Sequence, residues 1–320
     1  MLFDIVGAGA VGLLYTSGLI RAGIHVRLWT RTKQQADILR TEGLMVTERD
    51  GSLTRWRQVE AYPFQEAAQV IQDSGSPIEI LGLFVKQTHL TNSFINQLGA
   101  LPRATDSLFV CFQNGIGHIE RLQSVIAGEQ LVKAVTTEAA TRVEANRIIH
   151  AGSGITWLGQ DLTSCERLQK NIKVLNNLLN QAGFQSNLSN NIDNMIYHKL
   201  LINAVINPIT AMLRIPNGEL LQTERRVQLM RDVYEEVTSI YREAGIPVAN
   251  DAWDNVQLVC RNTAHNTSSM LADVLQGRST EIDSITGELL RKADAHALNV
   301  PVQRALYQFI QALDPMNPLL

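Results

Sequence analysis

Residues 2–30, LFDIVGAGAVGLLYTSGLIRAGIHVRLWT, decide the fold of this chain. Residues 2–6 form a short apolar run, and the glycine pattern GAGAVG at residues 7–12 follows it directly. Apolar residues then recur at helical spacing as far as Gly23, and residues 25–30 form a second apolar run. The order strand, G-x-G-x-x-G, helix and strand predicts the start of a Rossmann-type dinucleotide-binding domain.

Each glycine of this pattern has an expected structural role. Gly7 allows a tight turn, Gly9 lets the backbone approach a pyrophosphate, and Gly12 lets the helix pack close to the strand. The helix N-terminus offers N–H groups and a favourable dipole to phosphates. A glycine-rich turn without a ligand is the alternative. We expect the following residues to bind the cofactor: Gly7, Ala8, Gly9, Ala10, Val11 and Gly12.

The end of the second predicted strand indicates which dinucleotide is bound. An NAD site usually places Asp or Glu here, for the ribose 2′-hydroxyl. This chain instead continues with Thr30, Arg31, Thr32 and Lys33. Arg31 can donate two hydrogen bonds to a 2′-phosphate, and Lys33 adds positive charge. The sequence therefore predicts NADPH rather than NADH, with a solvated basic loop as the alternative.

Two further residues follow predicted strands of the same sheet. Residues 78–85 form a continuous apolar run that ends before Lys86, and residues 108–112 form another that precedes Asn114. Ligands of open α/β sheets bind beyond the carboxyl ends of the strands, so both residues are candidates for the cofactor site. A surface lysine and an ordinary Asn-Gly turn are the alternatives.

The remaining pattern divides the chain near residue 189. Residues 45–62 predict a hairpin around Asp50, residues 131–136 a strand, residues 141–158 two strands, and residues 164–182 a helix. Past Gly183 the pattern changes to helices only. We therefore predict an α/β fold with a Rossmann-type nucleotide-binding domain over residues 1–189 and an all-α domain over residues 190–320. Helices are expected over residues 225–244, 250–265 and 301–313, with a short one after residue 268 and another opened by Thr280–Asp283.

An apolar helix with a polar stripe opens the second domain. Residues 197–220 read YHKLLINAVINPITAMLRIPNGEL, in which Lys199, Asn203 and Asn207 recur every fourth residue and so share one helix face. Polar groups on an apolar rod are costly unless each has a partner, which a small polar substrate would supply. The solvated side of an amphipathic helix is the alternative. Pro208 is expected to end or kink the helix.

Composition excludes several classes of function. The 320 residues carry a net charge of −3, which gives no basic footprint for nucleic acid. The longest apolar stretches fall short of the roughly 18 residues of a membrane span. Cys111, Cys165 and Cys260 are widely spaced, and no His or Cys cluster suggests a metal. We expect a cytoplasmic protein without a metal site.

Six segments in a fixed order carry a resemblance that covers most of the chain. They are GAGAVG at Gly7, QNGIG at Gln113, HKLLINAVINPITA at His198, PNGEL at Pro216, NTSSMLADV at Asn266 and TEID at Thr280. Together they resemble the ketopantoate reductase (2-dehydropantoate 2-reductase) family. The resemblance implies a Rossmann-type domain, a helical domain and an active site in the cleft between them. It also implies NADPH as hydride donor and reduction of 2-dehydropantoate to (R)-pantoate, in pantothenate and coenzyme A synthesis.

The resemblance implies roles for individual residues. Lys199 resembles the general acid that protonates the nascent alkoxide, and Glu281 the acidic residue that binds the substrate hydroxyl near the lysine. Asn114 resembles the residue between nicotinamide and substrate, and Lys86 a lysine near the nicotinamide. Asn114 and Glu281 thus also belong to the expected cofactor site. The residues expected to bind substrate are Asn203, Asn207, Asn217, Ser269 and Asn114.

Three alternatives to this interpretation stay open. The chain could reduce another 2-oxo acid or an imine on the same fold. It could also bind NADPH as a sensor without chemistry, although a sensor need not keep Lys199 and Glu281. Thr280 and Asp283 could form only a helix cap, with Glu281 as an exposed first-turn acid. The expected partner is a small 2-oxo acid, and a homodimer is possible.

Overall fold

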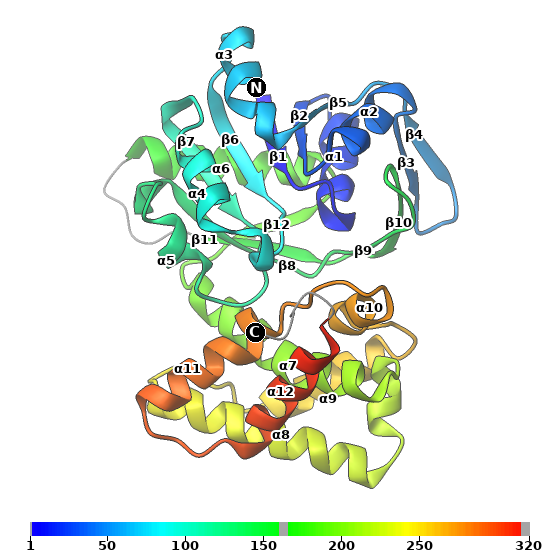
Figure 1. Ribbon diagram of the computed structural model, residues 1–320, viewed down its shortest axis with the longest axis vertical. Coiled ribbons are helices and arrows are strands. Elements are labelled where there is room, and N and C mark those ends of the chain that lie inside the picture. The colour runs from blue at the N-terminus through cyan, green and yellow to red at the C-terminus, as the bar shows by residue number, and fades with distance from the viewer. Residues whose placement is uncertain (1, 160–165, 315–320) are drawn as a thin grey trace. The chain divides into compact units, whose positions relative to one another are not determined.

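The computed structural model describes residues 2–159 and 166–314, and the chain divides into two compact units (Figure 1). The first unit contains the residues up to Gln113 together with His118–Ile192. The second contains Asn114–Gly117 together with the residues from Asp193 onward. The short segment Asn114–Gly117 therefore packs with the second unit, although it lies in the first half of the sequence.

The first unit alternates strands with helices. Its strands are β1 (Leu2–Val6), β2 (His25–Thr30), β3 (Leu44–Thr47), β4 (Leu53–Trp56), β5 (Glu60–Pro63), β6 (Ile78–Leu83), β7 (Arg103–Cys111), β8 (Leu131–Thr136), β9 (Ala139–Arg142), β10 (Arg147–Gly152), β11 (Ile155–Gly159) and β12 (Gln185–Leu188). Its helices are α1 (Ala10–Arg21), α2 (Lys33–Thr41), α3 (Ala67–Ser74), α4 (Asn92–Gly99), α5 (His118–Leu122) and α6 (Glu166–Gln181), with the 3₁₀ turns η1 (Phe64–Glu66), η2 (Gln87–His89) and η3 (Gly128–Gln130).

The main sheet has eight strands in the order β12-β11-β8-β7-β6-β1-β2-β5. All neighbours in it are parallel except β8 and β11. From β1 the chain goes to β2 and β5 on one side and then returns to β6 on the other. The point where the strand order reverses is where α/β sheets bind ligands. The predicted Rossmann-type domain is confirmed.

Alternating side chains of the central strands fill a core on each face of this sheet. On one face Phe3 and Ile5 of β1 are buried with apolar residues of α1 and α6. On the other face Val6 of β1 and Trp29 of β2 are buried with residues of α3, α4 and α5. Burial on both faces explains why these strands read as continuous apolar runs.

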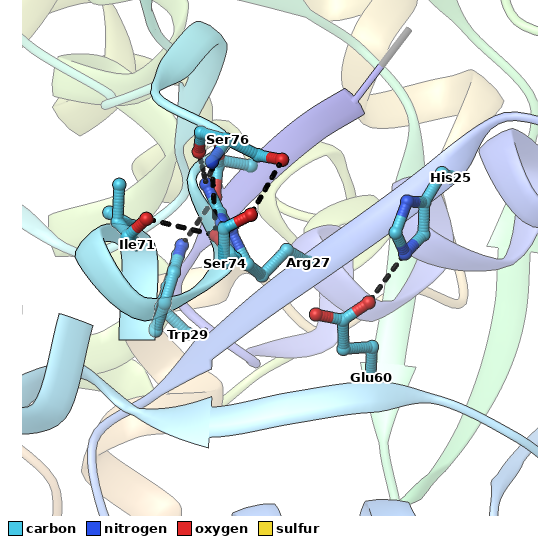
Figure 2. Close-up of polar contacts among 8 residues, drawn as sticks. His25, Arg27, Trp29, Glu60, Ile71, Ser74 and Ser76 are labelled. Carbon is cyan, nitrogen blue, oxygen red and sulfur yellow. Dashed lines mark hydrogen bonds and ion pairs between the residues drawn. The ribbon is translucent and has the colours of Figure 1, made fainter. Parts of the chain in front are cut away.

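One charged pair interrupts this apolar core. Asp4 and Arg27 are both fully buried, on neighbouring strands β1 and β2. Arg27 donates two hydrogen bonds to the Asp4 carboxylate, at 2.7 and 3.0 Å, and Trp29 Nε1 donates a third at 2.8 Å. Figure 2 shows the Arg27 guanidinium beside Ser74 and Ser76, to which it also donates. Removing either charge would leave the other buried and unpaired, which is strongly destabilising.

A second sheet of four strands, in the order β4-β3-β10-β9, accompanies the main one. The hairpin predicted over residues 45–62 is confirmed for β3 and β4, which are antiparallel. The last part of that range is β5, which instead joins the main sheet beside β2. We predicted two strands over residues 141–158, but the structure has three in this region. β9 and β10 belong to the second sheet, and β11 belongs to the main one.

One other prediction about the first unit needs correction, and another lies partly outside the described residues. The expectation of helices only past Gly183 is wrong, because β12 pairs in parallel with β11 at the edge of the main sheet. The predicted helix over residues 164–182 is seen as α6 from Glu166, whereas Ser164 and Cys165 lie outside the described residues.

The second unit is helical and encloses a single apolar core. Its helices are α7 (Ile192–Leu213), α8 (Glu224–Glu243), α9 (Ala252–Asn262), α10 (Ser269–Leu275), α11 (Glu288–Ala295) and α12 (Pro301–Leu313), with a 3₁₀ turn η4 (Asn217–Leu221) and a π-helix η5 (Asp283–Gly287) (Figure 1). Pro208 does not end α7, which continues to Leu213. Among the described helices, none combines the length and the hydropathy required to cross a bilayer.

Candidate active site

The glycine pattern forms the turn between β1 and α1. Gly7 has a φ of +114°, and a Cβ on it would lie 2.9 Å from backbone atoms of Phe84 and Val85. A Cβ on Gly12 would lie 2.0 Å from the carbonyl oxygen of Gly7. Around Gly9, by contrast, the described residues place no heavy atom within 4 Å of such a Cβ. Two glycines are thus required by packing, and the third borders open space that fits a close-approaching ligand.

The N-terminus of α1 faces this turn with an uncompensated dipole. The first helical hydrogen bond runs from Leu13 N to Gly9 O at 3.0 Å, so the N–H groups of Ala10, Val11 and Gly12 precede the helical ladder. The first turn contains no acidic residue. These N–H groups and the positive end of the helix dipole suit the diphosphate of a dinucleotide.

The carboxyl ends of the neighbouring strands are level with this turn. Val6, the last residue of β1, is in register with Trp29 of β2 and Leu83 of β6. Arg31 follows β2 directly and is exposed, with Nη1 3.4 Å from His89 Nε2. Thr32 caps α2, since its hydroxyl accepts from Gln35 N, and Lys33 is exposed in the first turn of that helix. This edge of the sheet therefore presents a guanidinium and an ammonium suited to a phosphate.

Lys86 follows β6 at the same edge and is partly buried. The loop that carries it is fixed by Gln113, whose Nε2 donates to the carbonyl oxygens of Leu83 and Val85, both at 3.1 Å. Next to Lys86, Gln87 contacts the buried His118 at 3.1 Å, and burial, reinforced by nearby Lys133, lowers the pKa of His118 to about 4. The sequence analysis assigned no role of their own to Gln113 and His118, because their partners Leu83, Val85 and Gln87 lie about thirty residues earlier in the chain.

The polar stripe of α7 lies in the second unit and is only partly exposed to solvent. Asn207 is 6% exposed, and Lys199 and Asn203 are partly buried. Burial lowers the pKa of Lys199 to about 8, although the negative charge of Glu281 opposes this shift. An ammonium with such a pKa releases its proton readily near neutral pH, as a general acid requires.

Glu281 is 8% exposed, so its interpretation as an exposed first-turn acid is wrong. Asn114 Nδ2 donates to its Oε2 at 3.2 Å, which brings two sequence-predicted residues together from positions 167 residues apart. Ile116 N also donates to Ser284 O at 3.3 Å. The segment Asn114–Gly117 thus docks on the turn that contains Glu281.

A π-helix, η5, begins two residues after this glutamate. Ile285 N donates to Glu281 O at 3.1 Å, and the Ser284 hydroxyl donates to the same carbonyl at 3.0 Å. The Asp283 carboxylate accepts from Tyr307 and Arg291. Single π-turns within α-helices are often found at functional sites, because they rotate the residues before them relative to an ordinary helix.

Two predicted substrate residues differ in their surroundings. Asn217 is 7% exposed and donates to the Thr263 hydroxyl at 2.9 Å, while no described donor reaches its buried Oδ1. Ser269 is exposed at the start of α10. Its neighbour Ser268 is the buried cap of α10 and contacts the Thr210 hydroxyl of α7 at 2.7 Å. The hydroxyl-rich segment therefore joins α10 to the stripe helix through Ser268.

The described residues contain no group of three or more His, Cys, Asp or Glu side chains placed to hold a metal ion. What they do contain is a glycine-rich turn of the dinucleotide-binding type in one unit, and Lys199 near Glu281 in the other. These features are typical of the class of oxidoreductases with a Rossmann-type domain.

Comparison with known proteins identifies the family. Residues 3–161 match "Ketopantoate reductase PanE/ApbA", and residues 191–314 match "Ketopantoate reductase PanE/ApbA C terminal". The chain therefore belongs to the ketopantoate reductase PanE/ApbA family, as the resemblance implied.

Individual relatives agree over nearly the full length. A 2-dehydropantoate 2-reductase of Listeria innocua is 33% identical, with 97% of this chain and 96% of the relative covered. The crystal structure of a probable 2-dehydropantoate 2-reductase from Bacillus subtilis is 30% identical, with a TM-score of 0.77 over 98% of this chain and 100% of that one. D-mandelate dehydrogenase, solved with NADH and anilino(oxo)acetate, has a TM-score of 0.87 at 22% identity over 98% of each chain, a likeness of fold alone.

Proposed function

We propose that this protein reduces 2-dehydropantoate to (R)-pantoate with NADPH, and thereby serves pantothenate and coenzyme A synthesis. One observation carries the proposal: Lys199 is partly buried near Glu281, and burial lowers its pKa to about 8. Membership of the ketopantoate reductase family supports the reaction. Arg31 and Lys33, in place of an acidic residue after β2, support NADPH as the cofactor.

Lys199 acts as the general acid. Bound NADPH supplies the hydride, and addition of hydride to a ketone leaves negative charge on the substrate oxygen. A cationic lysine in a partly dry environment stabilises that charge strongly and then donates its proton. Glu281 keeps the lysine cationic, since a nearby carboxylate favours the charged form.

The amide-bearing residues orient the substrate. Asn203 and Asn207 share the face of α7 that carries Lys199, and Asn217 offers the buried acceptor Oδ1 to a substrate hydroxyl. Glu281 accepts from the substrate hydroxyl, Asn114 contacts the substrate, and Ser269 adds a hydroxyl from α10. A small 2-oxo acid with hydroxyl and carboxylate groups matches this set. A cytoplasmic location and a homodimer stay predictions.

The test is NADPH consumption by the purified protein with 2-dehydropantoate and a panel of other 2-oxo acids, with NADH in parallel. We expect rapid oxidation of NADPH with 2-dehydropantoate and slow oxidation of NADH. Preference for another oxo acid would overturn the substrate and keep the lysine mechanism. Binding of NADPH without turnover of any substrate would contradict an enzymatic role.

A further inference from the structure

Gln35, on the first turn of α2, bridges two backbone carbonyls that are remote in the sequence. Its Nε2 donates to Ala8 O and to Ala145 O, both at 2.8 Å. A side-chain amide has two N–H donors, and both are used in this bridge. Ala8 is the second residue of the glycine pattern, and Ala145 lies in the turn between β9 and β10.

The carbonyl of Ala8 belongs to the same peptide unit as the N–H of Gly9. A trans peptide is planar and its C=O and N–H point in opposite directions. A hydrogen bond that holds Ala8 O therefore also fixes the direction of the Gly9 N–H. This control matters here because Ala8 stands between Gly7 and Gly9, and glycines allow the intervening peptide unit wide rotational freedom.

Ala145, at the other end of the Gln35 bridge, lies in a turn that is held by several hydrogen bonds. Asn146, next to Ala145, is 2% exposed and donates through Nδ2 to Gly43 O at 2.8 Å. Its own carbonyl accepts from Met45 N of β3 at 2.9 Å. The β9–β10 turn is thus tied to the second sheet at both the side chain and the backbone of Asn146.

A positive charge on the second sheet, that of Arg142, reaches the Ala8 carbonyl. Arg142, the last residue of β9, donates from Nη1 to Ala8 O at 3.3 Å while its side chain is largely exposed. A guanidinium beside the loop favours an anion bound to the loop's N–H groups. The two contacts come from different elements and converge on one atom.

From this convergence we propose that Gln35 is a positioning residue for the cofactor loop, with the second sheet as its support. Gln35 holds the Ala8–Gly9 peptide so that the Gly9 N–H faces the cofactor diphosphate, and Arg142 reinforces it. This role rests on the proposed function only in taking the glycine pattern as the dinucleotide site. It concerns the diphosphate, which NADPH and NADH share, and is therefore separate from the discrimination by Arg31.

The experiment measures NADPH and NADH dissociation constants, KM for each substrate and kcat for Gln35→Met and Gln35→Asn in the full-length enzyme. Methionine matches the length of glutamine without donors, and asparagine is one methylene too short to bridge both carbonyls. The matched control is Gln34→Met, at an exposed position in the same helical turn. Arg142→Met, at an exposed site, tests the reinforcing contact independently of any folding defect at Gln35.

We expect both Gln35 variants to weaken NADPH and NADH by about tenfold each, the size expected for losing an oriented hydrogen bond or two. We expect kcat at saturating NADPH and KM for the oxo acid to stay within about twofold of wild type, because the proposed role of Gln35 concerns the cofactor loop alone. Arg142→Met should weaken both dinucleotides by a smaller and equal factor.

Unchanged dinucleotide affinity in the Gln35 variants, or the same loss in Gln34→Met, would overturn the proposal. So would a fall in kcat without a change in cofactor affinity. If the wild-type protein binds neither NADPH nor NADH, the proposed function itself fails. The wild-type measurement therefore separates the two failures.

Discussion

Lys199 combines two opposing influences, since burial lowers its pKa and Glu281 raises it, with a result of about 8. A general acid is active only while protonated. We expect kcat/KM for the oxo acid to be level below pH 8 and to fall about tenfold per pH unit above it. Lys199→Ala should abolish this fall above pH 8, the alkaline limb of the profile, and should lose most of kcat, while NADPH affinity changes little. A pH–rate profile and a cofactor titration check both results.

A substitution of Glu281 provides the control for the prediction about Lys199. Glu281→Gln removes the charge that opposes the effect of burial, so the alkaline limb should move to lower pH. A limb that stays at the same pH in this variant would show that the limb belongs to another group.

We propose that Arg31 governs cofactor choice through the 2′-phosphate. Arg31→Asp replaces a phosphate-binding cation by an acid that suits a ribose hydroxyl. We expect NADPH affinity to fall by about a hundredfold while NADH affinity changes by less than about threefold. Equilibrium titration with both dinucleotides measures the ratio. An unchanged preference would mean that Arg31 does not contact the 2′-phosphate.

Residue types and spacing predicted part of the candidate site. The stripe Lys199, Asn203 and Asn207 could be recognised because three polar groups at a period of four are anomalous in an apolar helix. Gln35 could not, because its role lies in two hydrogen bonds to backbone atoms far along the chain. Likewise Ser268 and Ser269 are chemically equivalent in the sequence, and only the register of α10 decides which is buried.

At the scale of elements, the β1–α1 junction contains one glycine that packing requires, Gly12, and one that we propose for ligand binding, Gly9. A methyl group at Gly12 would collide with the backbone of Gly7, whereas one at Gly9 would enter open space. Gly12→Ala should therefore lower the free energy of unfolding by ~1–3 kcal/mol, as overpacking does. Gly9→Ala should leave stability within about 0.5 kcal/mol of wild type and weaken both dinucleotides.

Thermal unfolding and dinucleotide titration of the two variants test this contrast. Equal stability losses would refute the assignment of separate tasks to the two glycines. Equal dinucleotide affinities for Gly9→Ala and wild type would argue that no ligand approaches at Gly9.

The elements that the sequence analysis missed are those that depend on remote pairing. β12 reads QSNL, which has no apolar run, and becomes a strand only by pairing with β11. β10 pairs in parallel with β3, about a hundred residues earlier, so no local periodicity reveals the second sheet. The long apolar strands and the amphipathic α8 and α12 follow from their own residues and were predicted closely.

At the scale of the whole molecule, each unit has its own apolar core. We expect two unfolding transitions, because domains with separate cores violate two-state behaviour. Three of the four tryptophans, Trp29, Trp56 and Trp157, belong to the first unit, and Trp253 belongs to the second. Fluorescence of Trp253→Phe therefore reports on the first unit alone.

NADPH at about a hundred times its dissociation constant should raise the midpoint of that transition by roughly 5–10 °C. The second transition, followed by circular dichroism at a helix band, should move less. A single transition that shifts as a whole would contradict independent cores.

The docking of Asn114–Gly117 on the second unit has a consequence for biosynthesis. Asn114 leaves the ribosome 167 residues before its partner Glu281. At typical rates of synthesis this interval is roughly ten to thirty seconds. Most of the first unit can fold in that time, but the segment Asn114–Gly117 must wait for Glu281 and Ser284 to emerge before it can dock. The glutamate end of the candidate active site is thus completed well after the first unit has been synthesised, so a nascent chain forms the proposed cofactor-binding turn before the proposed catalytic pair.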